Sequence, residues 1–145
     1  MPNNDHIDAA FSFENYKFTE AYINLGALTE EDGLNIDFLP SGVYDPKTGV
    51  YEMTLGFCAS IKGANDEFVK IVKVKCIAIF KFRTVLPFED IPMFFFTNST
   101  AIIYPYIRAF VSTLTVQANF NAIVLPTLNI STLGVELKER TTIKK

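Results

Sequence analysis

The residues that could support nucleophilic catalysis are few and scattered in this chain. Its single histidine, His6, lies in a polar N-terminal stretch, residues 1–9, that we expect to be disordered. A Ser–His or Cys–His pair would therefore lack a well-placed base. The sequence also has no paired Cys or His spacing for zinc and no glycine-rich phosphate loop. We predict no catalytic residue, no metal site and no cofactor.

Two groups of carboxylates are candidates for a general acid or for metal ligands. Glu30, Glu31 and Asp32 stand together in a loop, where clustered acids usually form a solvated turn rather than a metal site. Glu89 and Asp90 lie within an apolar segment. For that pair, a salt bridge in a loop is favoured over an acid with a raised pKa.

The two cysteines, Cys58 and Cys76, are expected to be free thiols. If their strands form a hairpin, the two residues are about five positions out of register, which is on the order of 16 Å along a strand. A disulfide requires Cα atoms within about 7 Å. Free buried thiols are compatible with a reducing compartment.

Length and composition indicate one domain with a large aromatic content. The chain has 145 residues, of which 49% are hydrophobic, with fourteen Phe and six Tyr, and its net charge is −3. The lysines from Lys62 to Lys81 fall mostly along one predicted strand and are interpreted as its solvated face, so no nucleic-acid partner is expected. The N-terminus does not resemble a secretory signal, and Pro and Asn interrupt every apolar stretch that could span a membrane. The predicted location is the cytoplasm, without membrane insertion.

Hydrophobic periodicity predicts four antiparallel strands joined in meander order by short connections. The first strand changes parity twice, which indicates bulges. The second stops at Pro40, the third has one apolar and one polar face, and the fourth is apolar on both faces near its end. The predicted strands are Phe11–Leu25, Leu34–Leu39, Tyr51–Ile61 and Phe68–Phe82.

Two helices are predicted after the strands. Prolines make Leu86–Phe96 an irregular apolar linker, and the first helix is expected from Ser99 to Ala118, with Pro105 near its first turn. An apolar connector, Asn119–Leu128, leads to a short amphipathic helix over Asn129–Arg140. Residues 141–145 are expected to be disordered. The fold class is α+β, with the helices covering one face of a four-stranded sheet.

An uncharged segment dominates the C-terminal third. Between Ile91 and Val135 the only charged side chain is Arg108. Phe94, Phe95, Phe96 and the connector add more apolar surface than one small domain easily buries. Such surface is expected to form a core wall, a subunit interface or a binding groove.

The segment from Ile103 to Ile130 resembles the SecB family of protein-export chaperones. The residues that carry the resemblance are Pro105-Tyr106, Arg108, a Ser/Thr-rich second half of the helix, Leu125-Pro126 and Asn129. The predicted strand order and the end of the fourth strand are similar to that fold as well, and the likeness covers roughly Phe13 to Leu137.

The resemblance implies an ATP-independent holdase that binds unfolded polypeptides in hydrophobic grooves. It also implies a homotetramer, a dimer of dimers, with the long helices sandwiched between sheets. The implied client-binding residues are Phe120, Ile123, Val124, Leu125, Leu128, Ile130, Leu133 and Leu137. The implied oligomer interface comprises Ile103, Ile107, Phe110, Val111 and Leu114.

The resemblance is weaker where the family docks on the translocation motor. At the family's acidic docking positions this chain has Glu20, Asn24 and Lys73, so that one acid is kept, one is neutralised and one is reversed, and the chain ends in Lys144-Lys145. Glu20 is the remaining candidate for partner binding. A chaperone attached to a toxin–antitoxin system is a variant of the same hypothesis. A structural assembly subunit or a carrier of a small apolar ligand, such as a hot-dog-type fold, is the alternative.

Overall fold

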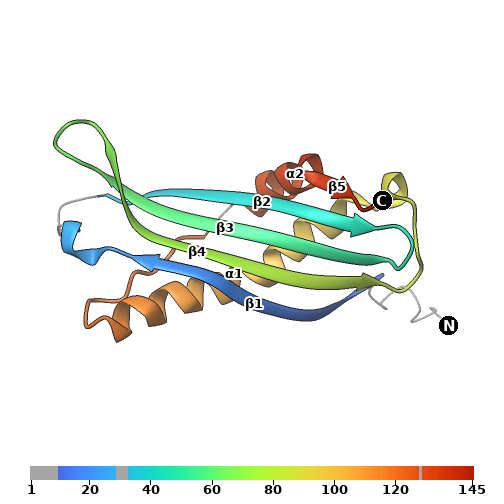
Figure 1. Cartoon of the computed structure of the whole chain (residues 1–145), viewed down its shortest axis with the longest axis horizontal. Helices are drawn as coiled ribbons and strands as arrows, with labels where there is room; N and C mark the ends of the chain where they lie inside the picture. The colour runs from blue at the N-terminus through green and yellow to red at the C-terminus, as the bar shows by residue number, and fades with distance from the viewer. Residues whose placement is uncertain (1–9, 29–32, 128) are drawn as a thin grey trace.

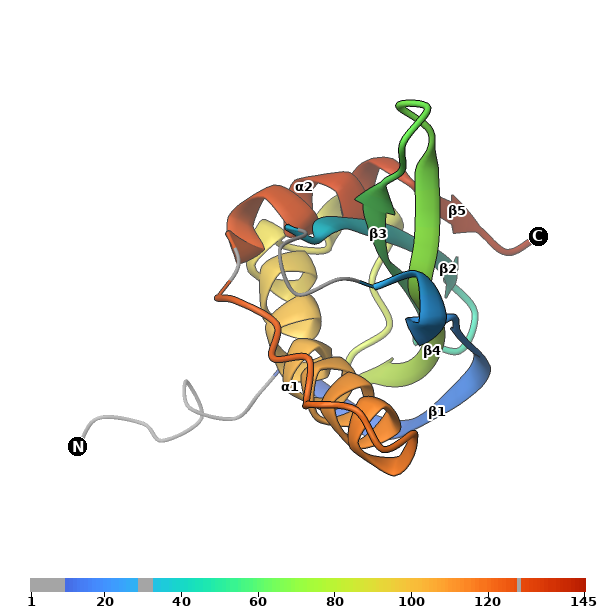
Figure 2. The ribbon, with the colours of Figure 1, turned by 90° about the vertical axis from the view of Figure 1, so that its left-hand side faces the viewer.

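The computed structural model describes residues 10–28, 33–127 and 129–145, and these form two layers. A sheet forms one layer, and the long helix α1 runs along one face of it with α2 beside it (Figures 1 and 2). The α+β class with a long helix and a short C-terminal helix is confirmed. The strands and helices are β1 Phe11–Ile23, β2 Asn35–Asp45, β3 Val50–Lys62, β4 Phe68–Phe82, α1 Met93–Gln117, α2 Ile130–Glu139 and β5 Thr141–Ile143, with short 3₁₀ turns at Leu25–Ala27 and Phe88–Asp90.

The strand order corrects the predicted meander. The sheet has five strands in the order β1-β4-β3-β2-β5, so β1 pairs with β4 rather than with β2. Short connections keep β2, β3 and β4 adjacent. The connection between β1 and β2, residues 24–34, is long enough to carry the chain from one edge of the sheet to the other. As a result β4 lies between β1 and β3, and its apolar residues Ile77 and Ile79 are half-buried on the face opposite α1.

The first strand contains two register shifts, as predicted, but the second lies before Tyr22 rather than after it, where the sequence parity indicated it. The pairing of β1 with β4 shifts register between Phe13 and Asn15 and again between Phe18 and Glu20. The first extra residue returns Tyr16 and Phe18 to the face that α1 covers, and the second turns Tyr22 to the opposite face. Phe13, Tyr16 and Phe18 therefore all point toward the helix, as their ring contacts with Tyr106 and Phe110 show.

The second strand continues past Pro40, where the sequence predicted its end. Gly42 N–H donates to the carbonyl of Arg140, and Tyr44 O accepts from Lys144, so these positions direct their backbone groups to the outer edge of β2. Pro40, two residues before Gly42, has its nitrogen on that same edge. A proline costs no ladder hydrogen bond there, which is why edge strands tolerate it.

The C-terminal residues form a strand where disorder was predicted. Residues Thr141–Ile143 pair in parallel with Gly42–Tyr44 and cover that part of the β2 edge. The hydroxyl of Tyr51, a fully buried side chain, lies 2.6 Å from Thr141 Oγ1. The hydrophobic pattern of three residues is too short to predict a strand, and this strand forms only because the edge of β2 is free to pair with it.

Helix α1 begins six residues earlier than predicted, directly after Pro92, so only residues 86–92 of the expected linker are irregular. Pro105 lies in its interior rather than in the first turn. Pro105 lies on an exposed side of the helix. The backbone carbonyl that would have accepted a hydrogen bond from residue 105 can therefore bind water instead.

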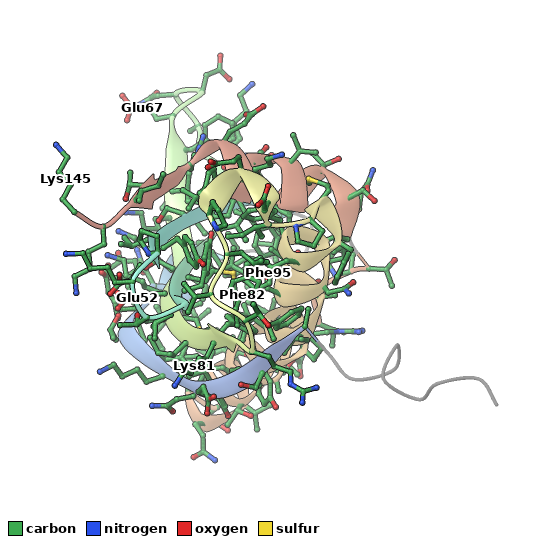
Figure 3. All side chains as sticks on the ribbon, turned by 90° about the vertical axis from the view of Figure 1, so that its right-hand side faces the viewer. Glu52, Glu67, Lys81, Phe82, Phe95 and Lys145 are labelled. Atoms are coloured by element: carbon green, nitrogen blue, oxygen red, sulfur yellow. The ribbon has the colours of Figure 1, made fainter. Side chains whose placement is uncertain are left out.

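Burial of the opposite side of α1 compensates for that lost hydrogen bond. Phe95 is fully buried, with ring centroids 4.6 Å from Phe82, 4.8 Å from Phe11 and 4.9 Å from Tyr51. Figure 3 shows Phe95 and Phe82 inside the molecule, whereas Glu52 and Lys81 lie on its surface.

The cysteines lie on opposite faces of the sheet and are free. Cys58 pairs with Lys73, and Cys76 pairs with Leu55, so the two are three positions apart rather than about five. Cys76 is fully buried, and burial raises the pKa of its thiol to about 11. Cys58 is half-buried on the face opposite the helices.

A thiol-labelling experiment tests this assignment of faces. At pH 8 the native protein should react at Cys58 alone, because Cys76 is inaccessible and remains in its unreactive protonated form. We expect one modified thiol per chain in buffer and two in denaturant. Loss of the native reaction in Cys76→Ser, rather than in Cys58→Ser, would contradict the arrangement.

Candidate functional site

The connector between the two helices, which the structure describes over residues 118–127, turns back along α1 (Figure 2). The helix ends in a Schellman motif, in which Phe120 N–H donates to Thr115 O and Asn119 N–H donates to Val116 O. Asn119 has a φ of 66°, a left-handed conformation that asparagine tolerates better than most residues. The chain therefore reverses direction at a defined point.

Three polar side chains of α1 hold the connector against the helix, and we call them the connector clamp: Tyr104, Ser112 and Thr115. Ser112 Oγ donates to Ile123 O at 2.8 Å, and Thr115 Oγ1 accepts from Ile123 N–H at 3.0 Å. The Tyr104 hydroxyl donates to Pro126 O, and burial raises the pKa of Tyr104, so the hydroxyl remains a donor. The Ser/Thr-rich half of the helix thus has a structural role.

The clamp leaves the connector with alternating exposure. Ile123 and Leu125 are 8% and 1% exposed, whereas Val124 between them is 65% exposed and Phe120 is 46% exposed. An extended segment places successive side chains on opposite sides. The inward side chains anchor the connector, and the outward ones form an apolar surface on it.

The predicted client-binding residues divide between core and surface. Ile123, Leu125, Leu133 and Leu137 are buried within the chain and support the surface from below. Ile130 is half-buried, and Phe120 and Val124 are exposed. Leu128 lies outside the described residues. Val135, 47% exposed on the outer side of α2, was not in the predicted set.

Helix α2 approaches α1 closely at a glycine. A Cβ atom on Gly134 would lie 2.8 Å from Thr97 Oγ1 and 3.0 Å from the Thr97 backbone nitrogen. Because a Cβ does not fit there, the residue that weakens helix propensity is the one that permits this packing.

The predicted interface residues lie mainly in the core of the single chain. Ile103, Ile107 and Val111 are 0% exposed, so they have no accessible surface to offer a second chain. They form the side of α1 that packs on the sheet. Phe110 and Leu114 are half-buried, and the Phe110 ring stacks on Phe18 with centroids 4.1 Å apart.

A row of aromatic side chains lies between β1 and α1, and sequence reasoning did not find it. We call it the aromatic seam: Phe13, Tyr16 and Phe18 of β1 with Tyr106 and Phe110 of α1. The Tyr16 and Tyr106 rings are 4.2 Å apart, and both residues are 38% exposed. Because β1 is an edge strand, the seam borders an unpaired sheet edge.

An apolar hollow of about 580 Å³ adjoins the start of the seam. Its lining is Ala10, Phe11, Phe13, Phe94, Asn98, Ala101 and Ile102, and Phe94 is 51% exposed. The helical residues repeat at positions i, i+4, i+7 and i+8. That periodicity could have been recognised only with the correct start of α1.

Glu20, the predicted partner-binding residue, is engaged by two lysines. Its carboxylate lies 3.2 Å from Lys73 Nζ and 3.6 Å from Lys75 Nζ. The hydrogen bond and charge of Lys73, with a smaller effect of Lys75, hold the pKa of Glu20 below its usual range. The group is solvent-exposed, so the stabilisation is small.

The described residues contain no group of three or more His, Cys, Asp or Glu side chains that could hold a metal ion. Within the same residues, no helix is both long and apolar enough to cross a membrane. Glu89 and Asp90 lie exposed in the short turn before α1. The acidic loop Glu30–Asp32 and His6 lie outside the described residues.

The sequence model of the family described as preprotein translocase subunit SecB matches residues 10–140. The chain belongs to the SecB family. A protein-export protein SecB of Aromatoleum aromaticum is 33% identical over 85 residues, covering 59% of this chain and 53% of the relative. An uncharacterised protein of Methanocaldococcus jannaschii is 31% identical over 79 residues, covering 53% of this chain and 51% of the relative. The chain thus spans about half the length of the curated relatives it matches.

A solved structure shares the fold of this SecB-family chain. It is a SecB-like chaperone of Mycobacterium tuberculosis in complex with a peptide from the HigA1 antitoxin. The match has a TM-score of 0.64 and 17% identity, and it covers 87% of this chain and 96% of that one. At this identity the likeness supports the arrangement of sheet and helices.

The connector clamp can be tested by replacing Thr115 with valine. Thr115→Val removes the acceptor of a buried N–H group while keeping the side-chain shape, so it should destabilise the fold by about 1–3 kcal/mol. Urea unfolding measures the loss, and hydrogen exchange of the Ile123 amide should accelerate. Thr115→Ser, which retains the hydroxyl, should restore protection.

Thr113→Val is the matched control, because Thr113 is exposed on the same helix. Its effect should stay within about 0.5 kcal/mol. Equal effects of the valine substitutions at positions 113 and 115 would mean that the connector is not held by the clamp.

Proposed function

We propose that this protein is an ATP-independent holdase that binds unfolded or non-native polypeptides on apolar surface along the connector and α2. Membership of the SecB family over residues 10–140 carries the proposal. The exposed connector side chains Phe120 and Val124 support it, since they are fixed in place by a hydrogen-bonded, extended backbone.

The chemistry of this surface favours promiscuous binding. An extended client could place apolar side chains against Phe120, Val124 and Val135 without sequence-specific hydrogen bonds. Arg108 is the only charge in the sequence between Ile91 and Val135, so few electrostatic contacts would select among clients. Neither ATP nor a metal or other cofactor is needed for such binding, and the proposal is a non-enzymatic, cytoplasmic protein.

The proposed assembly is a homo-oligomer, and a dimer of dimers is the form we favour. Three of the five predicted interface residues are buried in the chain's own core. We therefore propose that the interface forms on apolar surface that is exposed in the single chain. The aromatic seam and the adjoining hollow supply exposed apolar side chains next to the unpaired edge of β1. Large exposed apolar surfaces of this kind are typical of interfaces.

Two biological settings are proposed for the holdase. The relatives named protein-export protein SecB support a role in export, and the solved complex with an antitoxin peptide supports a role in a toxin–antitoxin system. Docking on the translocation motor through Glu20 is the less favoured partner interaction, because Glu20 is the one acid that this chain keeps at the family's three acidic docking positions. A carrier of a small apolar ligand remains the alternative, supported by the hollow of about 580 Å³.

The test is an aggregation assay with a reduced, unfolded α-lactalbumin client, together with the solution mass of the protein with and without that client. The wild-type protein should suppress aggregation and have the mass of about four chains. The double substitution Phe120→Ser and Val124→Ser should weaken client binding by about tenfold or more, because two apolar side chains no longer become buried.

Val85→Ser is the matched control, because Val85 is 48% exposed on a loop distant in sequence from the connector. It should bind the client as the wild type does. Failure of the wild-type protein to hold any unfolded client at stoichiometric concentration would reject the proposed function. Retention of client binding by the double variant would instead mean that the client binds on another surface of the protein.

A further inference from the structure

The face of the sheet opposite the helices carries a column of lysines along its central strand. Lys70, Lys73 and Lys75 of β4 pair with Ser60, Cys58 and Gly56 of β3 and occupy three successive positions on that face. We call them the lysine column. Successive positions on one face of a strand are about 7 Å apart. Lys73 and Lys75 have this spacing, whereas the register shift beside Ser60 places an extra residue between Lys70 and Lys73. The column is a row of three positive charges.

The groups that face the column leave its positive charge only partly balanced. Lys73 and Lys75 share one carboxylate, that of Glu20, and Lys70 Nζ lies 6.0 Å from the centre of the Tyr22 ring. Among the described residues, Asp37 lies in the same row as Lys73, but Cys58 separates the two, which places them about two strand spacings, or roughly 10 Å, apart.

A hollow of about 290 Å³ lies beside the column. Lys73 and Lys75 form one wall, and Leu39, 57% exposed, forms another. Gly56 leaves the space between them open because it has no side chain. The hydroxyl-bearing residues Ser41 and Thr54 complete the lining. The hollow thus combines two ammonium groups, two hydroxyl-bearing side chains and an apolar wall.

We infer that this outer face docks an acidic polypeptide segment of a partner protein. Carboxylates of the segment bind the lysine column, and an apolar side chain on the same side of the segment enters the hollow beside Leu39. The way Glu20 spans Lys73 and Lys75 demonstrates that a carboxylate fits between these two ammonium groups. An extended segment repeats its side chains at the spacing of the column.

The chemistry of the surrounding face favours a short peptide over a nucleic acid. Asp37, Asp45 and Glu52 lie on the same face around the column, as their pairing with Cys58, Val50 and Ile79 indicates. These acids would repel a long, uniformly charged phosphate backbone. A peptide with two or three carboxylates is short enough to contact the lysine column without contacting these acids.

This docking surface is independent of the proposed holdase function. The connector and α2 lie on the helical side of the sheet (Figure 2). The lysine column is on the other side, since Lys73 and Lys75 alternate along β4 with the buried Val74 and Cys76. A partner on the outer face could remain bound while a client occupies the connector surface.

The test uses fluorescein-labelled synthetic peptides and fluorescence anisotropy with the full-length protein. The probe is Gly-Glu-Ser-Glu-Ser-Leu-Gly, in which both Glu side chains and the Leu side chain lie on one side of an extended chain. The comparison peptide carries Lys in place of each Glu. The acidic peptide should bind and the basic one should not. Binding should weaken as salt is raised, because the contacts are partly exposed charges.

Two variants separate the roles of charge and shape. The double variant Lys73→Glu with Lys75→Glu should weaken binding of the acidic peptide by about tenfold or more, since two attractive contacts become repulsive. Gly56→Val keeps every charge but fills the hollow, where a Cβ atom would lie 3.5 Å from Leu39 Cβ without a clash. It should abolish the preference for this peptide over one with Ala in place of Leu.

Lys81→Glu is the matched control, because Lys81 lies on β4 and on the same face but outside the column. It should bind as the wild type does. Thermal unfolding of each variant verifies that the fold is retained, and an aggregation assay reports client holding separately.

The inference is overturned if the double lysine variant binds the acidic peptide as tightly as the wild type does. It is also overturned if acidic and basic peptides bind equally, or if a single-stranded oligonucleotide of matched charge binds more tightly than the acidic peptide. Loss of client holding with intact peptide binding would reject the proposed function and leave this docking surface standing.

Discussion

The burial of one side of α1 against the inner face of the sheet is the constraint on which the rest of the structure depends. Phe95 occupies the centre of this contact, surrounded by rings from β1, β3 and β4. Dense aromatic packing of this kind stabilises by buried area and by edge-to-face geometry. It permits a helix with Pro105 in its interior and with many mediocre helix formers to remain continuous over 25 residues.

The same helix also determines the position of the apolar surface that follows it. Its Ser and Thr residues, which would otherwise be poor choices for a helix, donate to and accept from the connector backbone. The connector is extended, so its polar groups need partners that no neighbouring strand supplies. Because α1 satisfies them, alternate connector side chains can be exposed on a defined backbone. An apolar binding surface on a disordered loop would lose more entropy on binding a client.

The two faces of the sheet have different chemistry, and the bulges in β1 maintain the difference. The first register shift keeps Tyr16 and Phe18 toward α1, and the second turns Glu20 and Tyr22 to the opposite face. The connector on the helical side is uncharged, and the opposite side carries the lysine column. The proposed holdase surface and the proposed docking surface therefore lie on opposite faces of the sheet and differ in charge.

The sequence by itself determined the class of the fold and the identity of its elements. Strict alternation in β3, the bounds of β4 and the two parity changes of β1 were correctly predicted, because these signals are local. The family resemblance rested on residues of α1 and the connector, and the family match over residues 10–140 agrees with it. The free cysteines also followed from local register.

Tertiary structure decided what depends on residues distant in sequence. The partner of β1, the pairing of β5 with the β2 edge and the continuation of β2 through Pro40 each require a neighbour that periodicity cannot reveal. In the candidate site, apolar type alone could not separate Val124, which is exposed, from Ile123 and Leu125, which are buried. Nor could it show that Ile103, Ile107 and Val111 face the chain's own sheet. The physical reason is that hydrophobic residues report a need for burial, and only the packed chain specifies what covers them.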